Sequence, residues 1–202
     1  MIAAIVLAAG ESRRMGYPKA LLRYRGRTFL ESVLEATSAA GIERRVIVVG
    51  SDADKILSSH DLSSCAVVRT ENQEAGPIGS IRAGVRSVIN HPVEAVLIWP
   101  VDQPHIAVST VQALLEKFVQ THSAIVLPTH GGRRGHPALF AREVFGELLA
   151  APDGEGARAV VRSRPERVVE VPVVDAAVVE DIDTQEAYQD LIRRSAFPEA
   201  TK

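Results

Sequence analysis

The sequence contains a single cysteine, Cys65, which excludes an intrachain disulfide. Because Cys65 lies in a short apolar run, we expect it to be an inert core residue. No apolar run approaches the roughly 20 residues that span a bilayer, so we expect no membrane segment. The apolar start of the chain has no basic residues before it, so the sequence predicts no signal peptide and a cytoplasmic location.

Neither sign of charge is in large excess, because 23 Lys and Arg stand against 25 Asp and Glu. A dedicated nucleic-acid-binding protein carries a basic stripe, so we expect no nucleic-acid partner and no anionic membrane surface as partner. Any positive charge that function requires must be concentrated locally. A chain of 202 residues fits one domain, which we expect over residues 1–195, with residues 196–202 as a mobile tail.

Short apolar runs alternate with amphipathic ones along the chain. Strands are expected at residues 2–7, 45–49, 65–69, 95–99, 124–127 and 168–171. Helices are expected at residues 28–40, 51–58 and 79–90, and from residues 109 and 184 onward. In the first of these, Thr28 and Glu31 match a capping box and Gly41 ends the helix.

Strand–helix–strand repetition predicts a Rossmann-like three-layer α/β/α sandwich with a mostly parallel sheet. Ligands of such sheets bind just beyond the carboxyl ends of the strands. Residues 129–164 show no such alternation and contain clusters of glycine. We expect this segment to be an irregular lid or acceptor-binding insertion of the same domain.

The most informative segment, residues 7–19, follows the first predicted strand and reads Leu-Ala-Ala-Gly-Glu-Ser-Arg-Arg-Met-Gly-Tyr-Pro-Lys. Gly10 and Gly16 allow backbone amides to converge on an anion, and Arg14 and Lys19 add full positive charge. The spacing excludes a Walker A loop and the dinucleotide G-x-G-x-x-G fingerprint. We therefore interpret residues 10–19 as a long phosphate-binding loop, the alternative being a solvated surface turn.

Two further segments carry candidate chemistry. Asp102 follows the predicted strand 95–99 and lies between two prolines that restrict the backbone. Because Mg²⁺ prefers few carboxylates together with waters and phosphate oxygens, Asp102 is a candidate metal ligand, or else a turn cap. Trp99 is expected in the core. In the second segment His136 lies in a restrained turn beside two arginines that offer bidentate donors, so residues 131–140 are the candidate acceptor site. The histidines lack zinc-binding spacing.

These motifs resemble the MobA-like NTP transferases, the nucleotidyltransferases of molybdenum cofactor biosynthesis. Residues 7–22 match the pattern L-A-A-G-x-S-x-R-M-G-x-P-K-x-L-L without a break, and the segments 101–104, 135–140 and 181–184 agree. The resemblance spans nearly the whole chain. It is closest to the cytidylyltransferase branch, because the guanylyltransferase branch usually opens L-A-G-G where this chain has Ala9.

The resemblance implies the nucleotide-diphospho-sugar transferase fold and transfer of CMP from CTP to the terminal phosphate of molybdopterin, with release of pyrophosphate. It implies Mg²⁺, or alternatively Mn²⁺, held by Asp102 and Asp183, with Asp181 as a further candidate. A helix N-cap is the alternative role for Asp183. The implied catalytic residues are Arg14, Lys19 and Asp102. The implied nucleotide-binding residues are Leu7, Ala8, Ala9, Gly10, Ser12, Arg14, Gly16, Lys19, Gly76, Gly79 and Ser80. The candidate acceptor-binding residues are Arg133, Arg134, Gly135, His136 and Pro137.

Several alternatives stay open. The methyl group of Ala9 should crowd a purine, which favours CTP over GTP by about 1–3 kcal/mol, yet a GTP-using guanylyltransferase is the nearest rival. Another cytidylyltransferase or a sugar-phosphate nucleotidyltransferase shares the opening motif. A carrier that delivers finished cofactor is an alternative of a different class, which the catalytic trio Arg14, Lys19 and Asp102 disfavours. The expected partners are the small-molecule substrates and a molybdenum hydroxylase or its maturation chaperone.

Overall fold

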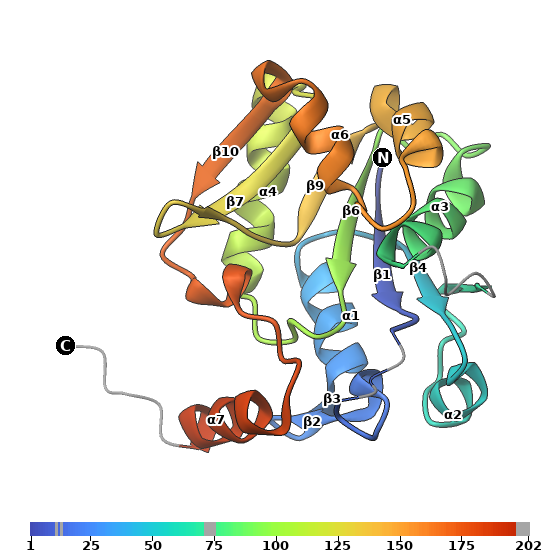
Figure 1. Cartoon of the computed structure of the whole chain (residues 1–202), viewed down its shortest axis with the longest axis vertical. Coiled ribbons are helices and arrows are strands. Elements are labelled where there is room, and N and C mark those ends of the chain that lie inside the picture. The colour runs from blue at the N-terminus through green and yellow to red at the C-terminus, as the bar shows by residue number, and fades with distance from the viewer. Residues whose placement is uncertain (11, 13, 71–75, 197–202) are drawn as a thin grey trace.

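The computed structural model describes all residues except 11, 13, 71–75 and 197–202, and it is built around one mixed sheet (Figure 1). The strand order is β10-β7-β9-β6-β1-β4-β5, with β8 paired to β7. The strands are β1 (Ile2–Ala8), β4 (Arg44–Val49), β5 (Ala66–Arg69), β6 (Ala95–Pro100), β7 (Ile125–His130), β8 (Arg133–Arg134), β9 (Ala138–Ala141) and β10 (Val168–Pro172). Only β8 and β9 of this sheet run against the others, which confirms the mostly parallel arrangement.

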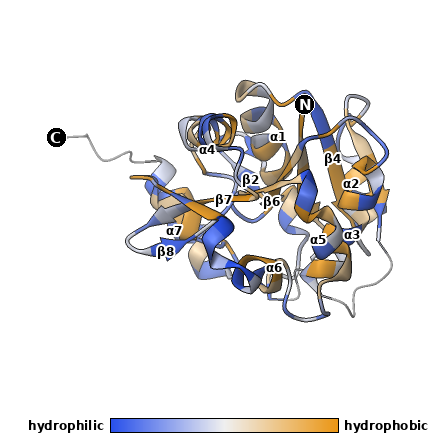
Figure 2. Cartoon of the chain, turned by 90° about the horizontal axis from the view of Figure 1, so that it is seen from above, coloured by the Kyte–Doolittle hydropathy of each residue, from blue (hydrophilic) through white to orange (hydrophobic). Residues whose placement is uncertain are grey.

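Helices cover both faces of the sheet, which confirms the three-layer sandwich (Figure 2). They are α1 (Phe29–Ala39), α2 (Ala53–Ser58), α3 (Pro77–Val88), α4 (Val108–Thr121), α5 (Phe145–Ala150), α6 (Arg158–Ser163) and α7 (Gln185–Ala196). Short 3₁₀ turns are η1 (Lys19–Leu21), η2 (Arg142–Val144), η3 (Pro165–Arg167) and η4 (Ala176–Val179). Helices α1 and α4 lie on one side, and α3, α5 and α6 lie on the other. In the described part of the chain, each helix is too short or too polar to cross a membrane.

Two hydrophobic clusters, one on each face, hold the layers together. Strand β1 contributes Ala4 and Val6 to the α1–α4 side, and Ala3 and Ile5 to the α3–α5 side. Because both faces of the central strands are covered, their sequences are continuously apolar rather than alternating. Trp99 is fully buried in the α1–α4 cluster, as predicted.

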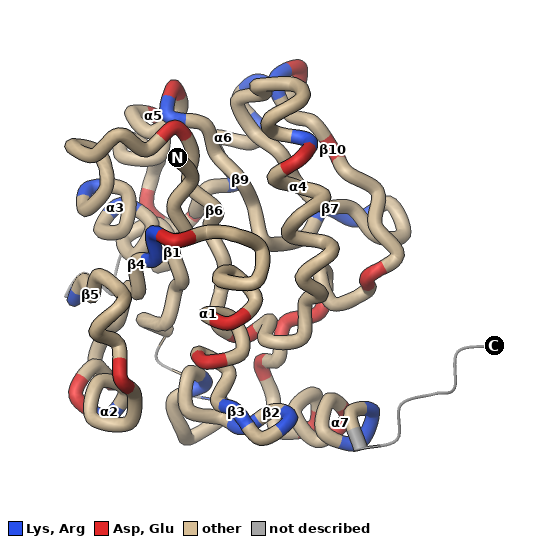
Figure 3. The backbone as a smooth tube through the Cα atoms, turned by 180° about the vertical axis from the view of Figure 1, so that it is seen from behind, with Lys and Arg blue, Asp and Glu red and all other residues tan. Residues whose placement is uncertain are grey.

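The predicted capping box of α1 is present. Thr28 Oγ1 accepts a hydrogen bond from the Glu31 amide at 3.1 Å, and the Glu31 carboxylate accepts one from the Thr28 amide at 2.6 Å. Gly41, with φ of +83°, ends the helical segment. A two-stranded hairpin, β2 (Arg23–Tyr24) and β3 (Arg27–Thr28), precedes this helix and carries exposed arginines (Figure 3).

The expectation of an irregular segment at residues 129–164 is wrong in part. Within it, β9 is fully buried and pairs antiparallel with both β6 and β7 at the middle of the sheet. A four-residue apolar run after a glycine-rich turn shows too little periodicity to be recognised as a strand. Cys65 also differs from expectation, because it precedes β5 and is only half-buried. Ala196 ends α7, and the rest of the expected mobile tail lies outside the described residues.

Candidate active site

The loops that follow β1 and β6 meet at the carboxyl edge of the sheet, where the strand order predicts a ligand site. A hollow at this edge is lined by Leu7, Ala8, Gly10, Ser12, Pro18, Lys19, Ala20, Asp52, Ile56, Val101 and Asp102. Six of these were expected site residues, namely Leu7, Ala8, Gly10, Ser12, Lys19 and Asp102. Asp52, at the start of α2, was not, because a lone aspartate after a strand has no distinguishing pattern.

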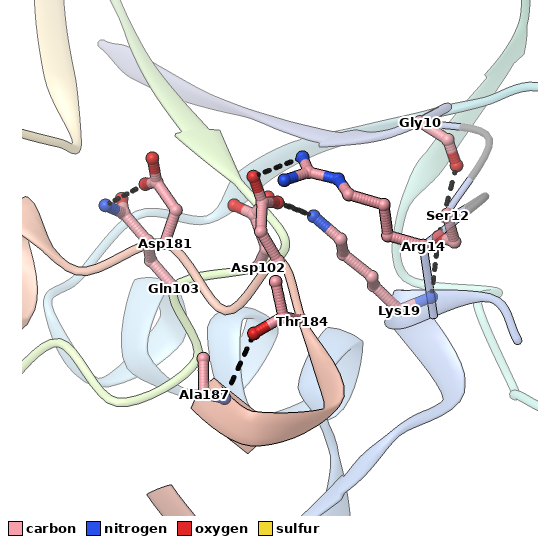
Figure 4. A network of polar contacts seen from close by, with 10 residues as sticks. Gly10, Ser12, Arg14, Lys19, Asp102, Gln103, Asp181, Thr184 and Ala187 are labelled. Atoms are coloured by element: carbon pink, nitrogen blue, oxygen red, sulfur yellow. Dashed lines mark hydrogen bonds and ion pairs between the residues drawn. The ribbon is translucent and has the colours of Figure 1, made fainter. Parts of the chain in front are cut away.

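Four charged side chains from three segments converge beside this hollow (Figure 4). Lys19 Nζ donates to Asp102 Oδ2 at 2.8 Å and also to Asp183 Oδ1. Arg14 Nη2 donates to Asp183 Oδ2 at 2.7 Å. The residues lie on the phosphate loop, after β6 and just before α7, so only the folded chain brings them together.

Burial and charge oppose each other at this cluster. Burial lowers the pKa of Lys19, but Asp102 and Asp183 outweigh it and hold that pKa above its ordinary value. Burial raises the pKa of Asp102, and the Lys19 ammonium offsets only part of that rise. For Asp183 burial also favours the neutral acid, but hydrogen bonds from Lys19 and Arg14 prevail and lower its pKa. The cluster therefore favours the charged forms of Lys19 and Asp183, whereas burial favours the neutral acid at Asp102.

The phosphate loop is organised around Ser12, which has a left-handed φ of +48°. The Met15 and Gly16 amides donate to the Ser12 carbonyl at 2.9 and 3.0 Å, and the Lys19 amide donates to Ser12 Oγ at 3.1 Å. These three amides are therefore already paired within the loop. The expectation of a free amide facing an anion is wrong for Gly16, and the positive charge at this loop comes from the Arg14 and Lys19 side chains.

The two aspartates before α7 have different surroundings. Asp183 faces Lys19 and Arg14, whereas Asp181 Oδ1 accepts a hydrogen bond from Gln103 Nε2 at 2.8 Å. The N-terminus of α7 is capped by Thr184, whose Oγ1 accepts from the Ala187 amide at 3.2 Å. The alternative of Asp183 as the helix cap is therefore wrong, and its carboxylate faces the site.

Asp102 and Asp183 fit a divalent cation that prefers oxygen ligands. Asp102 Oδ1 is buried and has no hydrogen-bond partner among the described residues, so one carboxylate oxygen is available to an incoming cation. The described residues contain no cluster of three or more His, Cys, Asp or Glu suited to a metal. A metal here would therefore need phosphate oxygens and waters to complete its shell, as Mg²⁺ commonly does.

Of the residues expected around the base, Ala9 and the segment 76–80 lie on the α3 face of the sheet, whereas Ala8 belongs to the α1–α4 cluster. Ala9 packs against the same cluster that contains Ile78 of α3. Gly76 precedes α3 with φ of +66°, but Gly79 and Ser80 lie inside its first turn rather than in a separate loop. Gly50, which the sequence reasoning missed, follows β4. A Cβ at Gly50 would lie 2.7 Å from the Ala9 carbonyl oxygen, so this contact requires glycine.

The expected acceptor residues divide into two groups. His136 donates its amide to the Val178 carbonyl at 2.8 Å, and a Cβ at Gly135 would lie 2.0 Å from the same oxygen. Pro137 is buried after a cis peptide bond. Burial lowers the pKa of His136, although the charge of Asp102 opposes that shift.

The two arginines of the acceptor segment do not join that cluster. Arg134 Nε donates to Glu170 Oε1 on β10 at 2.7 Å, and Arg133 is exposed on β8. Gln103, by contrast, was missed, and its side chain donates to the Val178 carbonyl at 3.4 Å, beside His136. Its position next to Asp102 was the only available signal.

Comparisons with known proteins agree with this geometry. The family model described as the MobA-like NTP transferase domain matches residues 4–168. The chain is 32% identical to a Paenarthrobacter nicotinovorans protein named nicotine blue oxidoreductase, over 92% of this chain and 93% of that protein. It is 31% identical to a probable molybdenum cofactor guanylyltransferase of Mycobacterium bovis BCG, over 71% and 69% of the two chains.

Two solved structures are similar to this chain over nearly its whole length. Rv0371c of Mycobacterium tuberculosis H37Rv has a TM-score of 0.85 and 33% identity, with 95% of this chain and 97% of that chain covered. A structure of Rv0371c in complex with manganese has a TM-score of 0.81 and 31% identity over 95% and 98% of the two chains.

Proposed function

Because the chain belongs to the MobA-like NTP transferase family and is a nucleotidyltransferase, we propose that it transfers CMP from CTP to the terminal phosphate of molybdopterin or its molybdenum form. The products are pyrophosphate and molybdopterin cytosine dinucleotide. The single observation that carries the proposal is the convergence of Arg14 and Lys19 with Asp102 and Asp183 at the sheet edge. Two cations and two carboxylates at one point suit a polyphosphate and a divalent ion.

In this mechanism Arg14 and Lys19 neutralise charge on the departing pyrophosphate. An oxygen of the acceptor phosphate forms a bond to the α-phosphorus of CTP, and the bond from that phosphorus to the pyrophosphate oxygen breaks. The acceptor needs no general base, because the second pKa of a phosphate is near 6. Asp102 and Asp183 would hold Mg²⁺ or Mn²⁺, which would stabilise negative charge on phosphate oxygens. Catalysis is then positioning and electrostatic stabilisation.

The preference for CTP rests on Ala9. Its methyl group lies on the α3 face together with Gly76, Gly79 and Ser80, which we propose to enclose the base. Leu7, Ala8, Gly10, Ser12 and Gly16 complete the proposed nucleotide site. A purine would need the space that the methyl group occupies, so Ala9→Gly should shift selectivity toward GTP by about the value of one methyl group, 1–3 kcal/mol.

The acceptor site is proposed around Gly135, His136 and Pro137. Burial favours the neutral imidazole of His136, which can then offer one donor and one acceptor to the substrate. His136 Nδ1 is buried without a partner in the described chain, which supports a role in contacting a ligand. Arg133 and Arg134 remain proposed contacts at the rim, although Arg134 would first have to release Glu170.

The relative named nicotine blue oxidoreductase offers a second candidate, an oxidoreductase activity. Hydride transfer does not require a pair of carboxylates facing a lysine and an arginine. The charged cluster therefore favours nucleotidyl transfer, and both activities can be measured on the same preparation.

The test is pyrophosphate release by the full chain with molybdopterin, Mg²⁺ and each of the four nucleoside triphosphates. We expect CTP to be the best substrate. Asp102→Asn should lower turnover about a hundredfold, equivalent to about 3 kcal/mol of barrier, with an unchanged circular dichroism spectrum. Asp190→Asn, on the exposed side of α7, is the matched control.

Three results would contradict the proposal or one of its parts. No pyrophosphate with any nucleotide, together with tight binding of the finished dinucleotide, would indicate a carrier. Oxidation of NADH or NADPH without pyrophosphate release would indicate a reductase. An unchanged CTP/GTP ratio in Ala9→Gly would remove the steric argument for CTP.

A further inference from the structure

The two proposed metal ligands are distant in sequence, so something must hold their loops in register. The Ile182 amide donates to the Asp102 carbonyl at 3.0 Å, which ties the two backbones directly. Ile182 itself is 2% exposed and belongs to the α1–α4 cluster. One residue to either side, Asp181 and Asp183 project to different partners.

Gln103 supplies the second tie between these loops (Figure 4). Its side chain is 1% exposed, and Nε2 donates to Asp181 Oδ1 at 2.8 Å and to the Val178 carbonyl at 3.4 Å. Its own carbonyl accepts from Trp99 Nε1 at 3.1 Å, so its backbone is fixed by a fully buried indole. Gln103 Oε1 is buried without a partner among the described residues, so the orientation of this side chain depends on the two hydrogen bonds that Nε2 donates.

We propose that Gln103 and Asp181 form a positioning pair that holds Asp183 in front of Asp102, and that Asp181 is not itself a metal ligand. The inference rests on the proposed function, because it assigns the metal to Asp102 and Asp183. In this arrangement Asp181 accepts a hydrogen bond from the Gln103 amide, while Asp183 accepts hydrogen bonds from Arg14 and Lys19. Groups that orient a metal ligand typically change metal affinity 10- to 100-fold when removed.

The pair makes a specific prediction about charge. Asp181→Asn keeps an oxygen that accepts from Gln103 Nε2 but removes the negative charge. Asp181→Ala removes the acceptor, and Gln103→Leu removes the donor at similar size. If the pair acts by positioning, Asp181→Asn should keep the metal affinity of the wild type, whereas Asp181→Ala and Gln103→Leu should lower it.

The experiment is titration of the full chain with Mn²⁺, with free Mn²⁺ measured by electron paramagnetic resonance. We expect Asp181→Asn to stay within about threefold of the wild-type affinity. Gln103→Leu and Asp181→Ala should each weaken it at least about tenfold, and the double variant should be little worse than either, because the two residues act as a unit. Gln112→Leu, on the exposed face of α4, is the control for the loss of an amide.

Two results would overturn the inference. An Asp181→Asn variant that loses as much Mn²⁺ affinity as Asp183→Asn would make Asp181 a ligand. A Gln103→Leu variant with wild-type affinity would show that the amide positions nothing. Thermal unfolding of each variant separates a local effect from misfolding. If Gln103→Leu unfolds at a lower temperature than the wild type, the comparison of Asp181→Asn with Asp181→Ala decides the inference. Failure of pyrophosphate release with CTP would defeat the proposed reaction, while the Mn²⁺ comparison would still judge the pair.

Discussion

Lys19 places one ammonium group against two carboxylates, and its side chain is only 15% exposed. In this arrangement the lysine contacts the same two carboxylates that we propose for the metal. A divalent ion and the ammonium group therefore compete for carboxylate charge. A triphosphate would relieve the competition, because its oxygens offer Lys19 and Arg14 another anionic partner.

Replacement of Lys19 should separate these two roles. We expect Lys19→Met to lower turnover about a hundredfold, because one cation no longer stabilises the leaving group. The same variant should bind Mn²⁺ more tightly than the wild type when no nucleotide is present, because Asp102 and Asp183 lose their competing partner. Kinetics and Mn²⁺ titration measure the two effects, with Lys55→Met on α2 as an exposed control.

An unchanged or weaker nucleotide-free Mn²⁺ affinity in Lys19→Met would contradict the competition. Among single residues, Arg14, Lys19 and Asp102 were singled out because charge after a predicted strand is visible in the order of residues, whereas Asp183 was implied by the family resemblance. The sequence did not single out Gln103, because burial and a distant partner have no sequence pattern.

Helix α4 shows how an element can depend on a distant residue. Its N-cap is Ala107, which has no side chain able to accept from a free amide. The Asp175 carboxylate, before η4, accepts instead from the Ala107 amide and from Thr110 Oγ1, each at 2.8 Å. It also caps η4 itself through the Ala177 amide at 3.1 Å.

Asp175→Ala should therefore lower the free energy of unfolding by about 1–2 kcal/mol, the usual cost of a lost cap. Asp175→Asn should lower the free energy of unfolding less, because the amide oxygen of asparagine can still accept a hydrogen bond. Urea-induced unfolding measures the difference, and Asp190→Ala on exposed α7 is the control. A loss below about 0.5 kcal/mol, the scatter of ordinary surface substitutions, would show that this carboxylate does not stabilise α4.

The elements differ in how well sequence predicted them. Helix α1 was predicted with its cap, because Thr28 and Glu31 act within four residues of each other. The cap of α4 and strand β9 were not predicted, because each depends on groups far away in the chain. Local hydrogen bonding leaves a local pattern, whereas pairing across the sheet does not.

Two half-buried histidines, His105 and His136, should make the stability of the whole molecule depend on pH. Burial lowers the pKa of His105 and of His136, although Glu180 and Asp102 respectively oppose this. The unfolded chain therefore binds these protons more readily than the folded chain. Above the ordinary histidine pKa of about 6.5, these histidines are neutral in both the folded and the unfolded chain. As the pH falls below that value, the unfolded chain takes up the protons first, so the folded state loses stability until the pH has passed the lowered pKa values.

We expect the melting temperature to fall between about pH 7.5 and 5.5, and to fall less in a His105→Gln/His136→Gln double variant. The comparison concerns the slope with pH, so a constant loss of stability in the variant does not obscure it. His91→Gln, at an exposed position, should keep the wild-type slope. Equal slopes in the wild type and the double variant would assign the pH dependence to other groups.

By itself, the sequence determined the layered α/β architecture, the phosphate loop and the charged residues of the site. Each of these depends on periodicity, capping or spacing within one short segment. Only the tertiary structure decided that Lys19 faces both Asp102 and Asp183, that Asp181 turns to Gln103, and that β9 occupies the middle of the sheet. Those outcomes depend on which distant groups meet when the strands pair and the two apolar faces are buried, and no local pattern in the chain specifies them.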